Sequence, residues 1–124
     1  MRFGNFLFPD SRDPARDGEV IDETMREALL ADELGADIVW LAEHHFDGIS
    51  VYADPIGLAG ALAASVKRAG LGFAVIQTAL HHPIRLAEQM ALLDHLMKGL
   101  PSRASSISDA SPDEPRITAG YGCV

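Results

Sequence analysis

Three apolar runs, each followed by a helical pattern, constrain the fold of this chain more than any other feature. The runs cover residues 3–8, 37–42 and 71–80. Their apolar residues are continuous rather than alternating, which is typical of strands buried on both faces of a parallel sheet. Helical patterns occupy residues 19–34, 53–70 and 81–99. Because strands that alternate with helices indicate parallel strands joined by right-handed crossovers, we predict an α/β fold with three βα units in residues 1–99.

The second helical pattern carries the clearest boundary signals. Asp54 suits the N-cap position and Pro55 suits the first helical position. Lys67 and Arg68 fall in the last predicted turn, where the helix dipole favours positive charge, and Gly70 follows as a terminator. These signals predict a helix that extends almost to residue 70.

The composition changes abruptly after the third helical pattern. Residues 100–124 read LPSRASSISDASPDEPRITAGYGCV and show neither helical nor strand periodicity. We predict an irregular or disordered tail there. Since the change comes where a fourth strand is due, we expect a truncated or frame-shifted chain. Three strands would leave the edge of the third strand open, and we therefore expect a fragment of low stability that aggregates or depends on a partner.

Charge and composition exclude several classes of function. The chain has 124 residues, and 10 Lys and Arg stand against 18 Asp and Glu, a formal net charge of −8. Nucleic acids and anionic membranes need a basic face, so neither is the expected partner. One cysteine, Cys123, gives no internal disulfide, which agrees with a cytoplasmic protein. No apolar run reaches the ~18 residues of a membrane helix. Glycine-rich dinucleotide, Walker and Gly-x-Ser-x-Gly motifs are absent from the sequence.

Ionisable side chains follow the second and third predicted strands. Glu43, His44 and His45 come directly after the second strand, and His81 and His82 follow the third. In parallel α/β folds the carboxyl ends of the strands form one edge, and functional sites lie there. A histidine at this edge could act as a general acid or base near neutral pH. The alternative is that these histidines are surface loop residues or mark the start of a helix.

The same residues could in principle bind a metal ion. Four histidines and one carboxylate at one edge are ligand types for zinc or iron. Adjacent histidines point in different directions, however, and rarely ligate one metal together. We therefore predict no metal site, and a metal-dependent hydrolase is kept as an alternative.

Long segments of the sequence resemble one known family. MRFGNFLFP, ADELGADIVWLAEHHF and HHPIRLAEQMALLDHLMKG resemble the bacterial luciferase-like flavin-dependent monooxygenases over about residues 1–99. The resemblance implies a partial (β/α)8 TIM barrel, of which the first three βα units are present. It also implies oxidation of a small organic substrate by O2 and a reduced flavin. The flavin would be FMN reduced by a separate flavin reductase, or a deazaflavin coenzyme as the alternative.

The resemblance also assigns residues to the expected site. His44 matches the family's catalytic histidine, a general acid or base. Glu43 matches a carboxylate beside the flavin. Ala74 and Val75 match the strand end that contacts the isoalloxazine ring, where the family often has a non-proline cis peptide. His45 belongs to the same motif without an assigned role.

Length is the main departure from the family. A TIM barrel takes about 250 residues, and this chain has 124. The alternative function is therefore a non-catalytic barrel fragment, or pseudoenzyme, that packs on another chain. Either function is compatible with a homo-oligomer or a hetero-oligomer.

Overall fold

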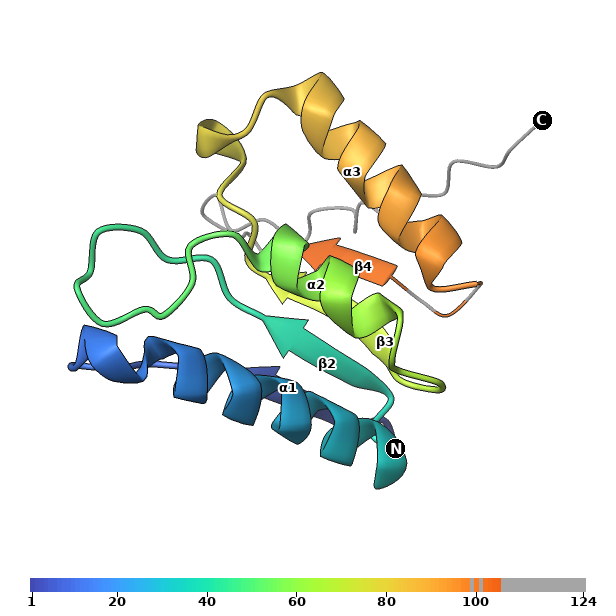
Figure 1. The fold of residues 1–124 in the computed structure, drawn as a ribbon. Coiled ribbons are helices and arrows are strands. Elements are labelled where there is room, and N and C mark those ends of the chain that lie inside the picture. Colours follow the sequence, from blue (N-terminus) through green and yellow to red (C-terminus); the bar gives the residue numbers. More distant parts are fainter. Residues whose placement is uncertain (99, 101, 106–124) are drawn as a thin grey trace.

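Four parallel strands form one sheet in the order β1–β2–β3–β4 (Figure 1). A computed structural model describes residues 1–98, 100 and 102–105. The predicted α/β fold with three βα units is confirmed. The elements in chain order are β1 (Gly4–Leu7), η1 (Pro14–Arg16), α1 (Asp17–Glu33), β2 (Ile38–Leu41), α2 (Pro55–Ala63), β3 (Gly70–Ala74), η2 (Thr78–Leu80), α3 (Pro83–Leu96) and β4 (Ser102–Ser105).

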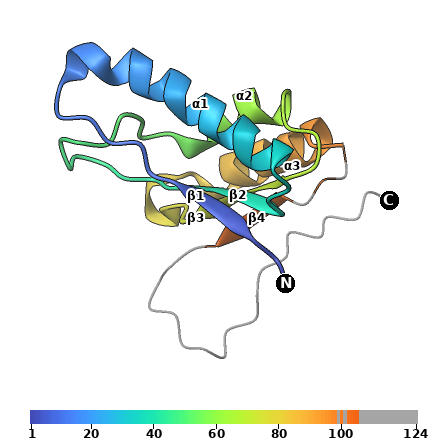
Figure 2. The ribbon, with the colours of Figure 1, turned by 90° about the horizontal axis from the view of Figure 1, so that it is seen from below.

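The three helices α1, α2 and α3 cover one face of the sheet (Figures 1 and 2). Alternate residues of β2 and β3 point toward them, and these side chains are fully buried. The side chains of α1 and α2 complete this apolar layer, and α3 contributes Leu93. Within the strands and helices, the apolar side chains with 0% exposure are those of Val39, Leu41, Leu71, Phe73, Ala28, Ala59 and Leu62. The hydrophobic core therefore lies between the sheet and a single layer of helices.

The opposite face of the sheet is aromatic and has no helix over it in the part of the chain that the structure describes (Figure 2). The indole of Trp40 on β2 lies across glycines of both neighbouring strands. A Cβ atom at Gly4 would lie 2.8 Å from Trp40 Nε1, and one at Gly72 would lie 2.5 Å from Trp40 Cε3. Phe6, which pairs with Trp40 across β1 and β2, is 51% exposed. Glycine on both sides thus makes the space that the indole occupies.

Helix α2 ends at Ala63, several residues before the predicted boundary. Its start is as predicted, because the Asp54 carboxylate accepts hydrogen bonds from the N–H groups of Ile56 and Gly57. The residues expected in its last turn instead lie in the α2–β3 loop. Their N–H groups donate to the carboxylate of Asp32 on α1, which thereby competes with continuation of the helix.

Residues 102–105 form β4, so the prediction of an irregular segment from residue 100 is wrong for this stretch. Leu71 to Ala74 of β3 pair with Ser102 to Ser105, and the predicted open edge of the third strand is therefore occupied. Backbone N–H and C=O groups make this pairing, and for that reason a polar sequence can add to an existing edge. The rest of the predicted tail, residues 106–124, lies outside the described residues.

Candidate functional site

The strand register brings the loops after β1, β2 and β3 to one edge of the sheet. Leu7 pairs with Leu41, and Leu41 pairs with Phe73. The chain leaves β2 and β3 within one or two residues of these positions, and Figure 1 shows both loops at the same edge of the sheet. The predicted ionisable residues lie in these two loops. The structure thus places Glu43 and His81 near one another although 38 positions separate them.

Four side chains form one hydrogen-bonded group at this edge, which we call the Glu43 cluster: Glu43, His45, Gln77 and His81. Glu43 is 1% exposed. Its Oε1 lies 2.7 Å from His45 Nε2 and 2.8 Å from His81 Nε2. Its Oε2 accepts the Gln77 backbone N–H at 2.8 Å, and its carbonyl oxygen accepts from Gln77 Nε2 at 2.9 Å. The cluster therefore joins the β2–α2 loop to the β3–α3 loop.

The Glu43 carboxylate is stabilised in its ionised form. Burial raises the pKa of Glu43, but the hydrogen bonds from His45, the Gln77 N–H and His81 together outweigh it. The net result is a pKa below the ordinary value of 4.5. At neutral pH the cluster thus holds a buried negative charge that its own donors compensate.

His44 and His45 point in different directions, as adjacent residues in extended backbone do. His45 joins the Glu43 cluster, whereas His44 is exposed and its ring meets the edge of Phe8, with ring centroids 4.7 Å apart and planes at 73°. Phe8 directly follows β1, so the aromatic contact links the ends of the first two βα units. The exposed imidazole of His44 is therefore accessible to a molecule bound at this edge.

A local turn fixes the backbone that follows the histidines. The Asp47 carboxylate accepts from the Ser50 hydroxyl and from the N–H groups of Ser50 and Ile49. These bonds lower the pKa of Asp47 to about 2. Phe46 precedes the turn with φ of 57° and is fully exposed. The loop also pairs with the segment after β1, where the Ser11 N–H donates to the Ile49 carbonyl oxygen at 2.8 Å.

Strand β3 ends at Ala74, earlier than the predicted strand boundary at residue 80. The peptide bond between Ala74 and Val75 is cis, and it lies at the position where the resemblance implied such a bond. Both residues are half-buried. Ile76 then returns to the core, and Gln77 begins the contacts with Glu43. Two small or branched apolar side chains thus lie at the strand end immediately before the Glu43 cluster.

Sequence reasoning located most of this site and missed one member. Gln77 was not singled out, although a polar residue that ends an apolar run was a usable signal. His82 is exposed and occupies the N-cap position of α3 without a side-chain capping bond. Within residues 1–98, 100 and 102–105, no group of three or more His, Cys, Asp or Glu side chains is arranged to hold a metal ion.

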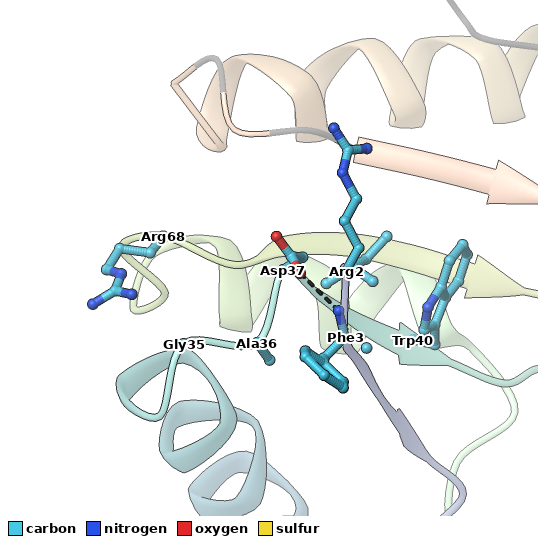
Figure 3. A pocket seen from close by; sticks show the side chains of 9 residues that line it. Arg2, Phe3, Gly35, Ala36, Asp37, Trp40 and Arg68 are labelled. Carbon is cyan, nitrogen blue, oxygen red and sulfur yellow. Dashed lines mark hydrogen bonds between the residues drawn. The ribbon is translucent and has the colours of Figure 1, made fainter.

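A hollow of about 660 Å³ lies at the opposite edge of the sheet (Figure 3). Its lining includes Arg2, Phe3, Asp37 and Arg68. The two arginine side chains point in different directions, and Asp37 accepts the Phe3 N–H at 2.7 Å (Figure 3). Its polar groups therefore do not converge on one point, whereas those of the Glu43 cluster do. We place the candidate site at the carboxyl edge for that reason.

Comparison with known proteins agrees with the family resemblance seen in the sequence. Residues 1–99 match the family model described as luciferase-like monooxygenase. The alkanal monooxygenase alpha chain of Photorhabdus laumondii subsp. laumondii is 34% identical over 99 residues, which are 80% of this chain and 28% of that protein. The limonene 1,2-monooxygenase of Rhodococcus erythropolis is 35% identical over 97 residues, which are 78% of this chain and 25% of that protein.

A solved structure supports the fold. The oxygenating constituent of 3,6-diketocamphane monooxygenase from Pseudomonas putida, in complex with FMN, superposes with a TM-score of 0.76 at 24% identity. The match covers 90% of this chain and 31% of that one. The chain therefore spans about a quarter to a third of the proteins it resembles. No helix among the described residues is long and apolar enough to cross a membrane.

Proposed function

Because the chain belongs to the luciferase-like monooxygenase family, we propose that it supplies the first part of a flavin site for the oxidation of an apolar organic substrate by O2. The observation that carries this proposal is the grouping of the Glu43 cluster, the exposed His44 and the Ala74–Val75 strand end at one edge of the sheet. The relatives named for alkanal and limonene oxidation support an apolar substrate class.

The residues at this edge fit a flat ring system. Ala74 and Val75 present small and branched apolar groups that are only half-buried, so a planar ring can approach them. Glu43 lies close to this strand end, since its Oε2 accepts the N–H of Gln77, two residues after Val75, and the hydrogen bonds of the cluster already compensate its charge. We propose Glu43, Ala74 and Val75 as the residues next to the flavin. Reduced FMN, when bound, supplies the two electrons needed to activate O2.

We propose His44 as the residue that moves protons. Its ring is exposed at the edge and held on one side by Phe8. A neutral imidazole has one nitrogen that can accept a proton and one that can donate it, so this ring could take a proton from the substrate or return one to it. FMN would arrive already reduced by a separate flavin reductase, as the family resemblance implies. A deazaflavin coenzyme is the alternative that binding experiments distinguish.

Titration of FMN into the purified 124-residue protein tests the proposal. We expect quenching of flavin fluorescence with micromolar affinity, and weakened quenching in Val75→Arg, which places a bulky charge where the ring would lie. His44→Gln should bind FMN as the wild type does, because His44 is proposed for proton transfer. His95→Gln, altered on the exposed surface at the end of α3, serves as the matched control.

Absence of binding by reduced and oxidised FMN and by a deazaflavin would refute the proposal for this chain. That result would favour the alternative function, a non-catalytic barrel fragment that packs on another chain. If wild type and Val75→Arg bind FMN with equal affinity, FMN binds to this chain but not at the strand end that we propose.

A further inference from the structure

His81 has no role in the proposed ring contact or in the proposed proton transfer, yet it is built into the site. Its Nε2 lies 2.8 Å from Glu43 Oε1, and His45 Nε2 lies 2.7 Å from the same oxygen. The two imidazoles come from different loops, one after β2 and one after η2. One carboxylate oxygen therefore joins two rings that are far apart in sequence.

The carboxylate leaves these rings little freedom. Glu43 Oε2 is held by the Gln77 N–H, and the Glu43 backbone carbonyl is held by Gln77 Nε2. The carboxylate group thus cannot rotate without breaking the bond at Oε2. Its remaining oxygen has two acceptor directions, and His81 occupies one of them. His45 is consequently confined to the other.

The shared oxygen also decides which nitrogen carries the proton. An ionised carboxylate only accepts hydrogen bonds, so both Nε2 atoms must bear hydrogen to bind it. Each ring in its neutral form then has an unprotonated Nδ1. Among the described residues no hydrogen bond reaches either Nδ1, and the side chains of His45 and His81 are 23% and 19% exposed. Both rings therefore keep an accessible acceptor.

We propose that His81 is a positioning residue of the site, and that Glu43 holds His45 and His81 in the Nε2–H tautomer so that two Nδ1 atoms accept hydrogen bonds from N–H or O–H groups of the bound ligand. The inference rests on the proposed function, since the acceptors matter only if a ligand lies at this edge. A ligand that fits this arrangement carries hydrogen-bond donors where it faces the two Nδ1 atoms. A ligand group with only acceptor atoms would be disfavoured there.

Nitrogen-15 NMR of the five imidazoles tests the tautomers in protein without flavin, at a pH where the rings are neutral. Single His→Gln variants of His44, His82 and His95 assign the three sets of signals from outside the Glu43 cluster, and the two remaining sets belong to His45 and His81. We expect His45 and His81 to show the Nε2–H form alone, and exposed His95 to show the averaged shifts of a ring that exchanges between tautomers. Averaged shifts, or the Nδ1–H form, at His45 or His81 would overturn the proposal. This measurement uses the wild-type protein and needs no variant of the cluster to fold.

Two variants of His81 test its positioning role. His81→Gln keeps an N–H donor for Glu43, whereas His81→Leu removes it. We expect the His45 ring signals to stay sharp in His81→Gln and to broaden or split in His81→Leu, with His82→Leu as the matched control beside it. Equal behaviour of the Gln and Leu variants would overturn the role.

FMN titration of the same variants separates this inference from the proposed function. Tautomers and ring order as expected, without binding of FMN or of a deazaflavin by the wild type, would leave the positioning role in place and refute the flavin site. FMN binding together with averaged tautomers would support the flavin site and overturn the positioning role.

Discussion

Asp32→Ala tests how much one buried carboxylate contributes to this fold. Asp32 is 5% exposed and accepts three backbone N–H groups, from Lys67 at 3.0 Å, Arg68 at 2.9 Å and Ala69 at 2.6 Å. Ala69 is fully buried, so its N–H would lose its partner without gaining water. The N–H groups of Lys67 and Arg68 belong to exposed residues, and water can replace their bonds.

The expected loss follows from these differences. A hydrogen bond to a charged group contributes about 1.5–3 kcal/mol, and a hydrogen bond that water can replace contributes much less. Relief from burying the Asp32 charge offsets part of the loss, because burial is the largest single influence on its pKa. We therefore expect the free energy of unfolding of Asp32→Ala to fall by about 2–3 kcal/mol, mostly through Ala69.

Asp32→Asn makes the prediction sharper. Arg68 and Ala69 both donate to Oδ1, so an amide oxygen at that position can keep both bonds, and only the bond from Lys67 to Oδ2 is lost. We expect a loss of about 1 kcal/mol for this variant. Asp22→Ala, at an exposed position of the same helix, is the control and should stay within about 0.5 kcal/mol of the wild type.

Urea unfolding followed by circular dichroism measures these differences, and hydrogen exchange of the Ala69 N–H reports the loop directly. Exchange should be faster in Asp32→Ala than in Asp32→Asn. The reasoning is refuted if the Asn and Ala variants lose the same stability, or if Asp32→Ala lies within about 0.5 kcal/mol of the wild type.

Three further predictions concern acid stability and the packing of two glycines. The pKa values of Glu43 and Asp32 lie below the ordinary 4.5 and 3.8, so the unfolded chain takes up protons first as the pH falls, and stability present at neutral pH is lost below about pH 4.5. A melting temperature that stays constant from about pH 6 to about pH 3 would contradict this. Gly72→Ala should lower stability by about 1–3 kcal/mol, because its Cβ would lie 2.5 Å from Trp40. Gly18→Ala, which meets nothing within 4 Å, should instead raise stability by about 0.4–1 kcal/mol in the same thermal unfolding assay.

Sequence patterns predicted the order of elements because burial on both faces and helix capping are local properties. Continuous apolar runs identified β1, β2 and β3, and Asp54 with Pro55 identified the start of α2. The predicted end of α2 was wrong because the helix stops where the following N–H groups bind the carboxylate of Asp32, which lies 37 positions before Ala69 in the sequence. Strand β4 was missed because residues 102–105 form no apolar run in the sequence, whereas their pairing with β3 is made by backbone groups.

The candidate site was predictable in its residue types and not in its bonds. Adjacent ionisable residues after two apolar strands indicated one functional edge, and Glu43, His45 and His81 do meet there. Which histidine of the adjacent pair bonds to Glu43 depends on how the backbone turns after β2, and sequence spacing does not encode that turn. The role of Gln77 likewise depends on the chain direction after Ala74, where β3 ends.

The indole that lies over Gly4 and Gly72 gives this protein an intrinsic optical probe. Trp40 is the single tryptophan of the chain, and it lies on the sheet face that no described helix covers. Its emission therefore reports the environment of one known place, which is half-buried in the chain alone. Any further strands or partner that cover this face would shift that emission toward the blue and shield it from soluble quenchers. The chain's own fluorescence thus reports whether anything covers this face of the sheet.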